Sequence, residues 1–150
     1  MDTLMQLINR THRCFTRYRS GLLTEEGLNG RQQRYILKIC ENPGVSQDQL
    51  ADWIAVDKSN VARQLFLLEQ AGFITRTTDA QDRRHLLIHP TEKALAVYPK
   101  ARKIVDDWNQ RLLDGVSEAE QAQLHSLMER IALRAAQLAD APKQPDEKGR

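Results

Sequence analysis

The sequence predicts a mainly α-helical fold with a small β-hairpin, arranged as a winged helix-turn-helix between N- and C-terminal helices. Three observations support this prediction. Apolar residues recur at helical spacing through most of the 150 residues. Two short helical stretches in the middle of the chain are joined by a tight connection, as in a helix-turn-helix. Directly after them the apolar period changes from 3.6 to about 2, which indicates two short strands.

Length and composition are those of one globular domain. Hydrophobic residues make up 41% of the chain and charged residues 28%, which is ordinary for such a domain. A chain of this length buries most of its unfolded surface and needs neither disulfide nor metal to stay folded. The formal net charge is only +2, so the total charge neither indicates nor excludes a nucleic-acid partner.

Cysteine usage and hydropathy predict a cytoplasmic protein without a membrane partner. The two cysteines, Cys14 and Cys40, are too few for a disulfide framework. The N-terminus lacks the apolar run of a secretory signal. No stretch is long and apolar enough to cross a bilayer.

The first predicted helix covers residues 2 to about 20. Its apolar residues recur at three-, four- and seven-residue steps: Leu4, Ile8, Phe15, Tyr18 and Leu22. A second stripe of the same helix carries Arg10, Arg13 and Arg17. This stripe fits a solvated face, a partner interface or an anion-binding wall.

Two capping boxes predict the next two helices. Asn29 with Gln32 begins a helix from about Gly30 to Glu41, which Pro43 and its neighbours end. This helix is expected to bury Tyr35, Ile36, Ile39 and Cys40. Ser46 with Gln49 begins a short helix with Leu50, Ala51 and Ile54 turned inward. Only residues 55 and 56 separate it from the following helix.

That following helix, residues 57–72, organises the rest of the chain. Asp57 is suited to cap its free amides and Gly72 to close it in the left-handed conformation. The residues predicted to be buried are Val61, Leu65 and Leu68. The outer side carries Ser59, Asn60, Arg63 and Gln70, with Gln64 at its edge. It is nearly free of carboxylates, and arginine and amide side chains are the groups that read base edges in a major groove. The alternative is an ordinary solvated amphipathic helix.

Two strand-like runs follow, at residues 73–77 and 85–89. The polar stretch DAQDRR, residues 79–84, connects them and is too long for a two-residue turn. We therefore predict a hairpin with an extended, basic-tipped loop, which is the wing of a winged helix.

Two long helices complete the prediction. Thr91 and Glu92 begin a helix that extends to about Asp114, and Pro99 predicts a kink or a local break inside it. Ser117 with Glu120 is another capping box, and it begins the last helix. The apolar face of the last helix consists of Leu124, Leu127, Met128, Ile131 and Leu138. Residues 141–150 are nearly devoid of apolar side chains and are expected to form a disordered tail.

The region from Gly44 to Lys93 resembles the MarR family of bacterial transcription regulators. The resemblance rests on the ordered set GVSQDQLADWIAVDKSNVARQLFLLEQAGFITR, then DAQDRR, then Thr-Glu-Lys at residues 91–93. The outer helices occupy the family's places, so the resemblance covers nearly the whole chain. It implies one domain, with a DNA-binding winged helix-turn-helix at residues 30–93 and dimerisation helices at residues 1–29 and 94–140.

The same resemblance implies a homodimeric, sequence-specific regulator of transcription. We expect a repressor that binds a pseudo-palindromic operator in double-stranded DNA and is released by a small ligand or a stress signal. The organising helix would enter the major groove, and the tip of the wing would reach the adjacent minor groove. The implied groove contacts are Ser59, Asn60, Arg63 and Gln64.

Further contacts are implied for the wing and for the DNA backbone. Arg83 and Arg84 match the wing arginines, of which Arg84 is better placed for a narrow minor groove. Asp82 matches the carboxylate that braces a wing arginine. The expected phosphate contacts are Lys58, Gln47 and Arg31. The chain departs from the family at Phe66 and Leu67, which project outward where polar residues are more usual. They would touch thymine methyls or sugars, or pack on the wing.

The family's effector pocket lies where the dimer helices meet the reading domain. The candidate wall residues are His12, Arg13, Arg17, Tyr35 and Trp108. An arginine in such a pocket would suit an anionic aromatic acid.

Two alternatives stay open at this stage. Some MarR-type regulators sense oxidants through a cysteine on the N-terminal helix, and the arginines near Cys14 would favour a reactive thiolate. Cys14 is otherwise a small apolar filler at the dimer interface. The second alternative is a winged helix that binds protein and no longer reads DNA. The presence of Asn60, Arg63, Arg83 and Arg84 argues against it.

The sequence gives no indication of an enzyme. It contains no nucleophile grouped with a base and an orienting residue, no glycine-rich phosphate loop and no pair of catalytic carboxylates. The four histidines lack the local spacing of metal ligands. We therefore expect no cofactor and no metal, and histidines that lie at the surface or an interface.

Overall fold

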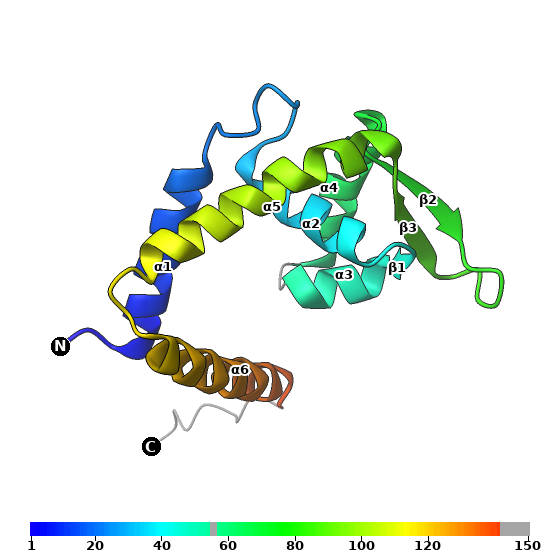
Figure 1. Ribbon diagram of the computed structural model, residues 1–150. Coiled ribbons are helices and arrows are strands. Elements are labelled where there is room, and N and C mark those ends of the chain that lie inside the picture. The colour runs from blue at the N-terminus through cyan, green and yellow to red at the C-terminus, as the bar shows by residue number, and fades with distance from the viewer. Residues whose placement is uncertain (55–56, 142–150) are drawn as a thin grey trace, which may run out of the picture. The chain divides into compact units, whose positions relative to one another are not determined.

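The computed structural model describes residues 1–54 and 57–141. It contains a small sheet and six helices, and it divides into a first unit, Met1–Asn109, and a second unit that begins at Gln110. The elements in chain order are α1 (Leu4–Arg19), α2 (Gly30–Glu41), β1 (Val45–Ser46), α3 (Gln47–Ile54), α4 (Lys58–Gln70), β2 (Ile74–Thr78), β3 (Leu86–Pro90), α5 (Glu92–Leu112) and α6 (Glu118–Asp140) (Figure 1). The predicted fold class is confirmed. The connection at residues 55 and 56, and the tail from residue 142 on, lie outside the described residues.

The predicted caps begin α2, α3 and α4. Asn29 and Gln32 exchange two hydrogen bonds of 3.0 Å at the start of α2. The Ser46 hydroxyl accepts from the Gln49 amide at 3.1 Å, so the second capping box is formed too. Asp57 Oδ1 accepts from the Asn60 amide at 2.8 Å. Each cap satisfies amides that the first turn of a helix leaves without a partner.

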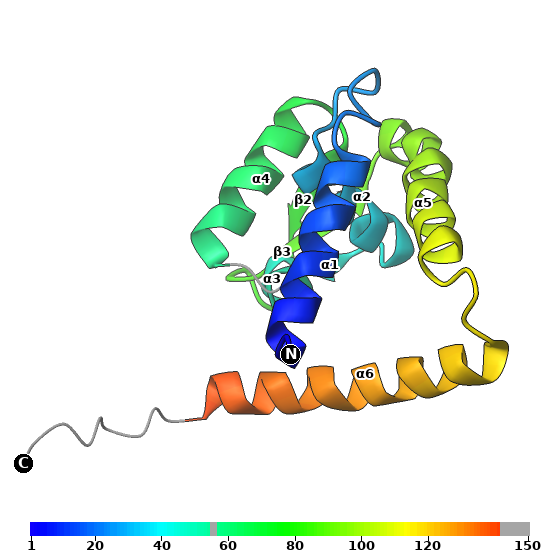
Figure 2. The ribbon, with the colours of Figure 1, turned by 90° about the vertical axis from the view of Figure 1, so that its left-hand side faces the viewer.

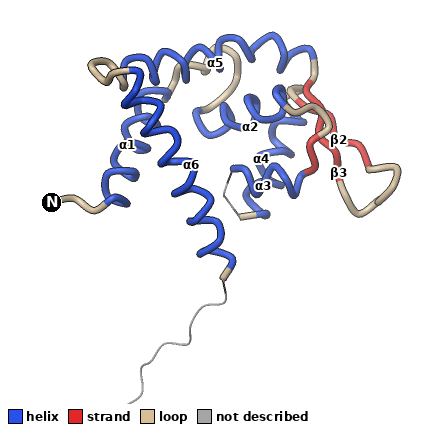
Figure 3. Tube along the Cα trace, turned by 60° about the horizontal axis from the view of Figure 1, so that its bottom comes forward, coloured by secondary structure: helices blue, strands red, loops and turns tan. Residues whose placement is uncertain are grey.

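The three strands form an antiparallel sheet with strand order β1-β3-β2, in which β1 precedes α3 and the other two strands follow α4. The two strands of the hairpin begin one residue later than predicted, and Thr78 pairs with Leu86 at the open end. Strand β1 was not predicted, because two residues are too few to show alternation. It pairs Val45 with Ile88. We call β2, β3 and the loop of residues 79–85 the wing, which projects from the helices in Figure 3.

The core of the first unit lies between these helices and the sheet. Its fully buried large side chains come from α2, α3, α4 and the strands: Tyr35, Ile36, Ile39, Leu50, Val61, Leu65, Leu68, Phe73, Ile74 and Ile88. Burial of one large apolar side chain contributes about 1.5–3 kcal/mol. This core turns one side of α4 inward and leaves its other side to solvent.

Helix α5 continues through Pro99, so the predicted local break is wrong. A proline removes one backbone hydrogen bond, and packing on either side of it supports the helix. Ala94 and Ala101 are fully buried on α5. The buried Gln33 side chain of α2 also donates to the Ala101 carbonyl at 2.8 Å.

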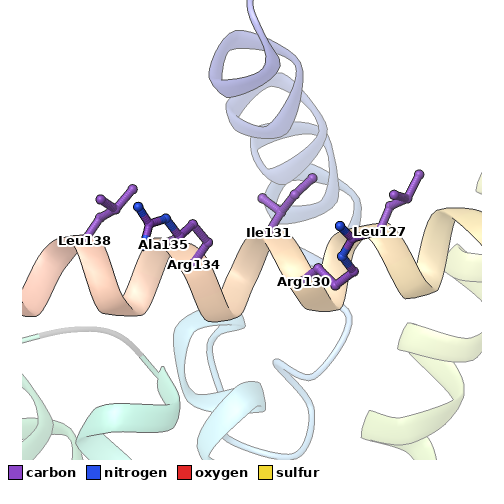
Figure 4. A pocket seen from close by; sticks show the side chains of 6 residues that line it. All are labelled: Leu127, Arg130, Ile131, Arg134, Ala135 and Leu138. Atoms are coloured by element: carbon purple, nitrogen blue, oxygen red, sulfur yellow. The ribbon is translucent and has the colours of Figure 1, made fainter.

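The second unit contains α6, which begins at the predicted capping box. Ser117 Oγ accepts from the Glu120 amide at 3.3 Å, and the Glu120 side chain accepts from the Ser117 amide at 2.9 Å. No residue of α6 is buried. Figure 4 shows Leu127, Ile131 and Leu138 along this helix, next to two arginines. None of the helices within residues 1–54 and 57–141 combines the length and apolar character needed to cross a membrane.

Candidate nucleic-acid interface

The solvent-facing side of α4 carries the polar residues that the sequence placed there. Lys58, Ser59 and Arg63 are exposed and Asn60 is partly exposed. Val61, Leu65 and Leu68 face the core and fix the rotation of the helix. Figure 2 shows α4 along one edge of the first unit. The helix can therefore present a guanidinium, an ammonium and an amide to a partner without moving.

Gln64 departs from the prediction. Its side chain is buried, with only 6% of the residue exposed, and its Oε1 makes no hydrogen bond to any residue within 1–54 and 57–141. The reason is helical spacing, because Gln64 comes three residues after Val61 and four before Leu68 and so belongs to the buried stripe. Because its side chain is polar, the pattern of apolar residues did not assign Gln64 to the buried side of the helix. In the described conformation Gln64 is therefore not available as a groove contact.

Phe66 and Leu67 project outward as predicted. They are 51% and 43% exposed. Both follow Arg63 on the open side of α4. An apolar pair at this position can contact thymine methyl groups in a major groove.

The wing carries two arginines, Arg83 and Arg84, and Asp82 fixes the second of them by hydrogen bonds. Arg84 donates to both carboxylate oxygens of Asp82, from Nε at 3.1 Å and from Nη2 at 3.0 Å, and its backbone amide donates to Oδ1 at 3.1 Å. This side-on pairing fixes the plane of the guanidinium. Arg83 is exposed and makes no hydrogen bond or ion pair within the described residues.

The Asp82–Arg84 pair stays charged and open to solvent. Hydrogen bonding from Arg84 lowers the pKa of Asp82, and the carboxylate in turn raises the pKa of Arg84. The Arg84 side chain is 88% exposed. Asp82 thus braces Arg84, as the resemblance implied, while the remaining guanidinium donors face outward.

His85 connects the wing to α3, which the sequence did not indicate. Its Nδ1 lies 3.3 Å from Asp48 Oδ2, and its Nε2 lies 3.4 Å from Asp82 Oδ2. Asp48 also lies 3.4 Å from the Lys58 ammonium at the start of α4. In the described parts of the chain, no group of three or more His, Cys, Asp or Glu side chains is arranged to hold a metal ion.

The expected phosphate contacts differ in their surroundings. The Lys58 side chain is 77% exposed despite its ion pair with Asp48. Arg31 is exposed in the first turn of α2. Gln47 is half-buried in the first turn of α3, and its buried Oε1 has no hydrogen-bond partner among the described residues.

The five candidate effector residues do not form one cavity. Arg17 and Trp108 line an open hollow of about 400 Å³ together with Cys14 and Tyr18. His12 and Arg13 line a different hollow along α1. Tyr35 is fully buried in the core.

Sequence reasoning missed Arg19, which the structure places beside the aromatic cluster. The guanidinium carbon of Arg19 lies 5.0 Å from the centre of the Phe15 ring, and only 7% of the residue is exposed. Trp108 packs against Phe15 and Tyr18 with ring centres 5.5 and 5.0 Å apart. Burial, and then the nearby Arg34, lowers the pKa of Arg19.

The two cysteines differ in their surroundings. Cys14 is exposed on α1 and Cys40 is partly buried. Burial, together with the charge of Glu41, raises the pKa of Cys40 to about 11. A thiol of this kind is protonated and unreactive at neutral pH, which leaves Cys14 as the cysteine on which a redox role would depend.

Comparison with known proteins gives one consistent result. The model of the MarR family matches residues 28–86. The HTH-type transcriptional regulator YybA of Bacillus subtilis (strain 168) is 35% identical over 100 residues, which is 67% of either chain. The HTH-type transcriptional regulator BilQ of Clostridium symbiosum is 29% identical over 117 residues, 78% of this chain and 81% of that protein.

Solved structures agree with these relatives. The transcriptional regulator SlyA superposes with a TM-score of 0.86 at 32% identity, over 91% of this chain and 96% of that one. A MarR family transcriptional regulator from Listeria monocytogenes, solved in complex with a 26mer DNA, gives a TM-score of 0.89 at 25% identity, over 97% and 99% of the two chains.

Proposed function

The chain belongs to the MarR family of transcriptional regulators, and we propose that it acts as a homodimer that binds a pseudo-palindromic operator and represses transcription. One observation supports this most strongly. The outer side of α4 presents Lys58, Ser59 and Arg63 to solvent, while the wing holds a braced, exposed Arg84. These groups suit a major groove and a minor groove, respectively.

Each group has a distinct part in the proposed complex. Arg63 and Asn60 read base edges, since arginine pairs with guanine and asparagine with adenine through two hydrogen bonds each. Ser59 supplies a further contact in the same groove. Lys58, Arg31 and Gln47 contact phosphates and position the protein without reading sequence. Arg84 enters the minor groove, and Arg83 adds a second positive charge at the tip of the wing.

A second copy of the chain explains the apolar side chains that the outer helices leave uncovered. On α1, Leu4, Met5 and Leu7 are 50%, 58% and 42% exposed. On α6, Leu124, Leu127, Leu133 and Leu138 are 47%, 43%, 67% and 60% exposed. Exposed apolar surface of this extent is typical of an interface. A two-fold dimer would present its two reading helices to half-sites about 34–36 Å apart.

Release from DNA follows from the same arrangement. In the dimer, a small ligand that favours a spacing of the two α4 helices unsuited to DNA shifts the population away from the DNA-binding form. The hollow lined by Arg17, Tyr18 and Trp108 offers a cation beside two aromatic rings, which suits an anionic aromatic acid. We place the protein in the cytoplasm, where an operator is accessible.

Selection of bound duplexes from a random pool tests the proposal. The expected result is a pseudo-palindromic consensus whose affinity falls about 10³–10⁵-fold between 50 and 200 mM salt, as for 6–10 neutralised phosphates. The double variant Arg63→Ala/Arg84→Ala is the control and should enrich no sequence. Failure of the wild type to enrich any duplex would instead favour the protein-binding alternative.

Release of the protein from the selected duplex can distinguish a ligand signal from an oxidant signal. Anionic aromatic acids should release both the wild type and the Cys14→Ser variant if the ligand hollow is the sensor, because serine nearly keeps the size of the cysteine that lines it. Peroxide should release only the wild type if the Cys14 thiol is the sensor. Equal release of both proteins by peroxide would rule out Cys14.

A further inference from the structure

We infer that His85 is a positioning residue that fastens the wing to α3 when its imidazole is protonated, and so sets where Arg84 meets DNA. The inference rests on the proposed function, because it concerns how the wing is presented to a duplex. It begins from one juxtaposition, in which the His85 ring lies between the carboxylates of Asp48 and Asp82.

The two carboxylates belong to different parts of the winged helix. Asp48 lies in the first turn of α3, inside the helix-turn-helix. Asp82 lies in the loop of the wing, where it also accepts the hydrogen bonds of Arg84. The His85 ring therefore spans from the wing to the helix-turn-helix, while backbone bonds between Asp79 and His85 and between His85 and Asp82, both 3.0 Å long, hold its own main chain.

The charge of the imidazole decides how many of these contacts are favourable. A protonated imidazole carries a positive charge and an N–H on each nitrogen, so it attracts both carboxylates, whose oxygens lie 3.3 and 3.4 Å from its two ring nitrogens. A neutral imidazole has one N–H and one lone pair, and the second carboxylate then faces the lone pair. Loss of the proton thus converts one of the two contacts from attraction to repulsion.

The surrounding charges form an alternating series from the reading helix to the tip of the wing. Lys58 pairs with Asp48, Asp48 and Asp82 flank His85, and Asp82 pairs with Arg84. These are the charged groups that face His85 or its two partners. With His85 neutral the series has no net charge, and with His85 protonated it gains one positive charge. Protonation of His85 therefore joins the wing to α3 and also makes this surface more attractive to phosphate.

The direction of the pH dependence follows. Histidine side chains ordinarily exchange their proton between about pH 5 and 8. Protonation of His85 then holds the wing against α3, and loss of the proton releases it. Histidine is the side chain whose ordinary range lies here, so the change is expected to originate at His85.

Backbone ¹⁵N relaxation of residues 79–85 in the DNA-free protein tests the connection itself. We expect the wild-type loop to be more ordered at pH 5.5 than at pH 8. His85→Gln keeps a similar size without the titration and should remove this pH dependence, as should Asp48→Asn. His125→Gln is the matched control, since His125 is an exposed histidine next to Glu129 on α6, and it should retain the wild-type behaviour. A pH-independent wild-type loop, or an unchanged pH response in His85→Gln, would overturn the inference.

Fluorescence anisotropy with the selected duplex then measures the effect on DNA binding. The affinity ratio of wild type to His85→Gln should rise roughly two- to fivefold from pH 8 to pH 5.5, the size expected for exposed ion pairs. A ratio that stays constant would contradict the role in positioning Arg84. If the loop responds to pH but no duplex is bound, the connection stands and the proposed function fails. If a duplex is bound but the loop does not respond to pH, the proposed function stands and the inference about His85 fails.

Discussion

The Glu69 carboxylate in the last turn of α4 accepts two hydrogen bonds from the Arg76 guanidinium in β2, at 3.0 and 3.2 Å. This pair joins the reading helix to the first strand of the wing. Two parallel hydrogen bonds restrict the angle between the partners more than a single contact does. The relative direction of α4 and β2 is therefore set partly by this ion pair and partly by the core beneath them.

The Glu69–Arg76 pair should make stability depend on pH. Hydrogen bonding from Arg76 lowers the pKa of Glu69 from its ordinary value of 4.5. The stabilisation is thus present above about pH 4.5 and is lost as the pH falls through the lower, folded-state pKa. We expect Glu69→Gln to lower the Tm by about 2–4 °C at pH 7 and the gap from wild type to narrow when the pH is lowered to 3. Glu25→Gln, at an exposed position, should show no such gap, and a gap of equal size at both pH values would refute the assignment.

Arg84→Ala should weaken operator binding while leaving the dimer intact. Removal of one cationic contact lowers the affinity about tenfold and reduces the salt slope by about one. Anisotropy across salt concentrations and sedimentation velocity measure the two properties. Arg83→Ala is the neighbouring control with a smaller expected loss, because no carboxylate orients Arg83. A monomeric Arg84→Ala protein would assign this residue to folding or assembly instead.

Arg63→Ala and Lys58→Ala should fail in different ways. Arg63 is proposed to read a base edge, so its loss should cost about 1–3 kcal/mol of discrimination at one operator position. Lys58 is proposed to contact phosphate, so its loss should weaken binding to operator and unrelated duplexes alike. Repeating the selection with each variant tests this. A consensus unchanged in Arg63→Ala but relaxed in Lys58→Ala would reverse the two roles.

Leu65→Ala should destabilise the protein far more than Leu67→Ala, although both shorten a leucine on the same helix. Leu65 is fully buried, whereas Leu67 is 43% exposed. Truncation of a buried leucine costs about 2–5 kcal/mol, and an exposed one typically less than about 1 kcal/mol. Urea unfolding at equal protein concentration measures both. Similar losses would mean that Leu67 is covered in solution, which would point to a contact with the wing or the partner subunit.

Local features of the fold could be predicted from the sequence because they depend on neighbours within about four residues. The capping pairs Asn29–Gln32, Ser46–Gln49 and Ser117–Glu120 all form as predicted. The buried and exposed sides of α4 follow from the positions of Val61, Leu65 and Leu68. The bracing of Arg84 by Asp82 is also local, and the resemblance to the family pointed to it.

What the sequence determined by itself was therefore the order of the helices and of the two hairpin strands, the helix caps and the side of α4 that faces outward. Only the tertiary structure decided that Gln64 lies in the core, that the candidate effector residues separate into different hollows, and that His85 meets Asp48. Helical spacing assigns a residue to one side of its own helix, but the partners of a side chain come from distant segments. Core packing determines which segments meet, and that packing is a property of the whole fold.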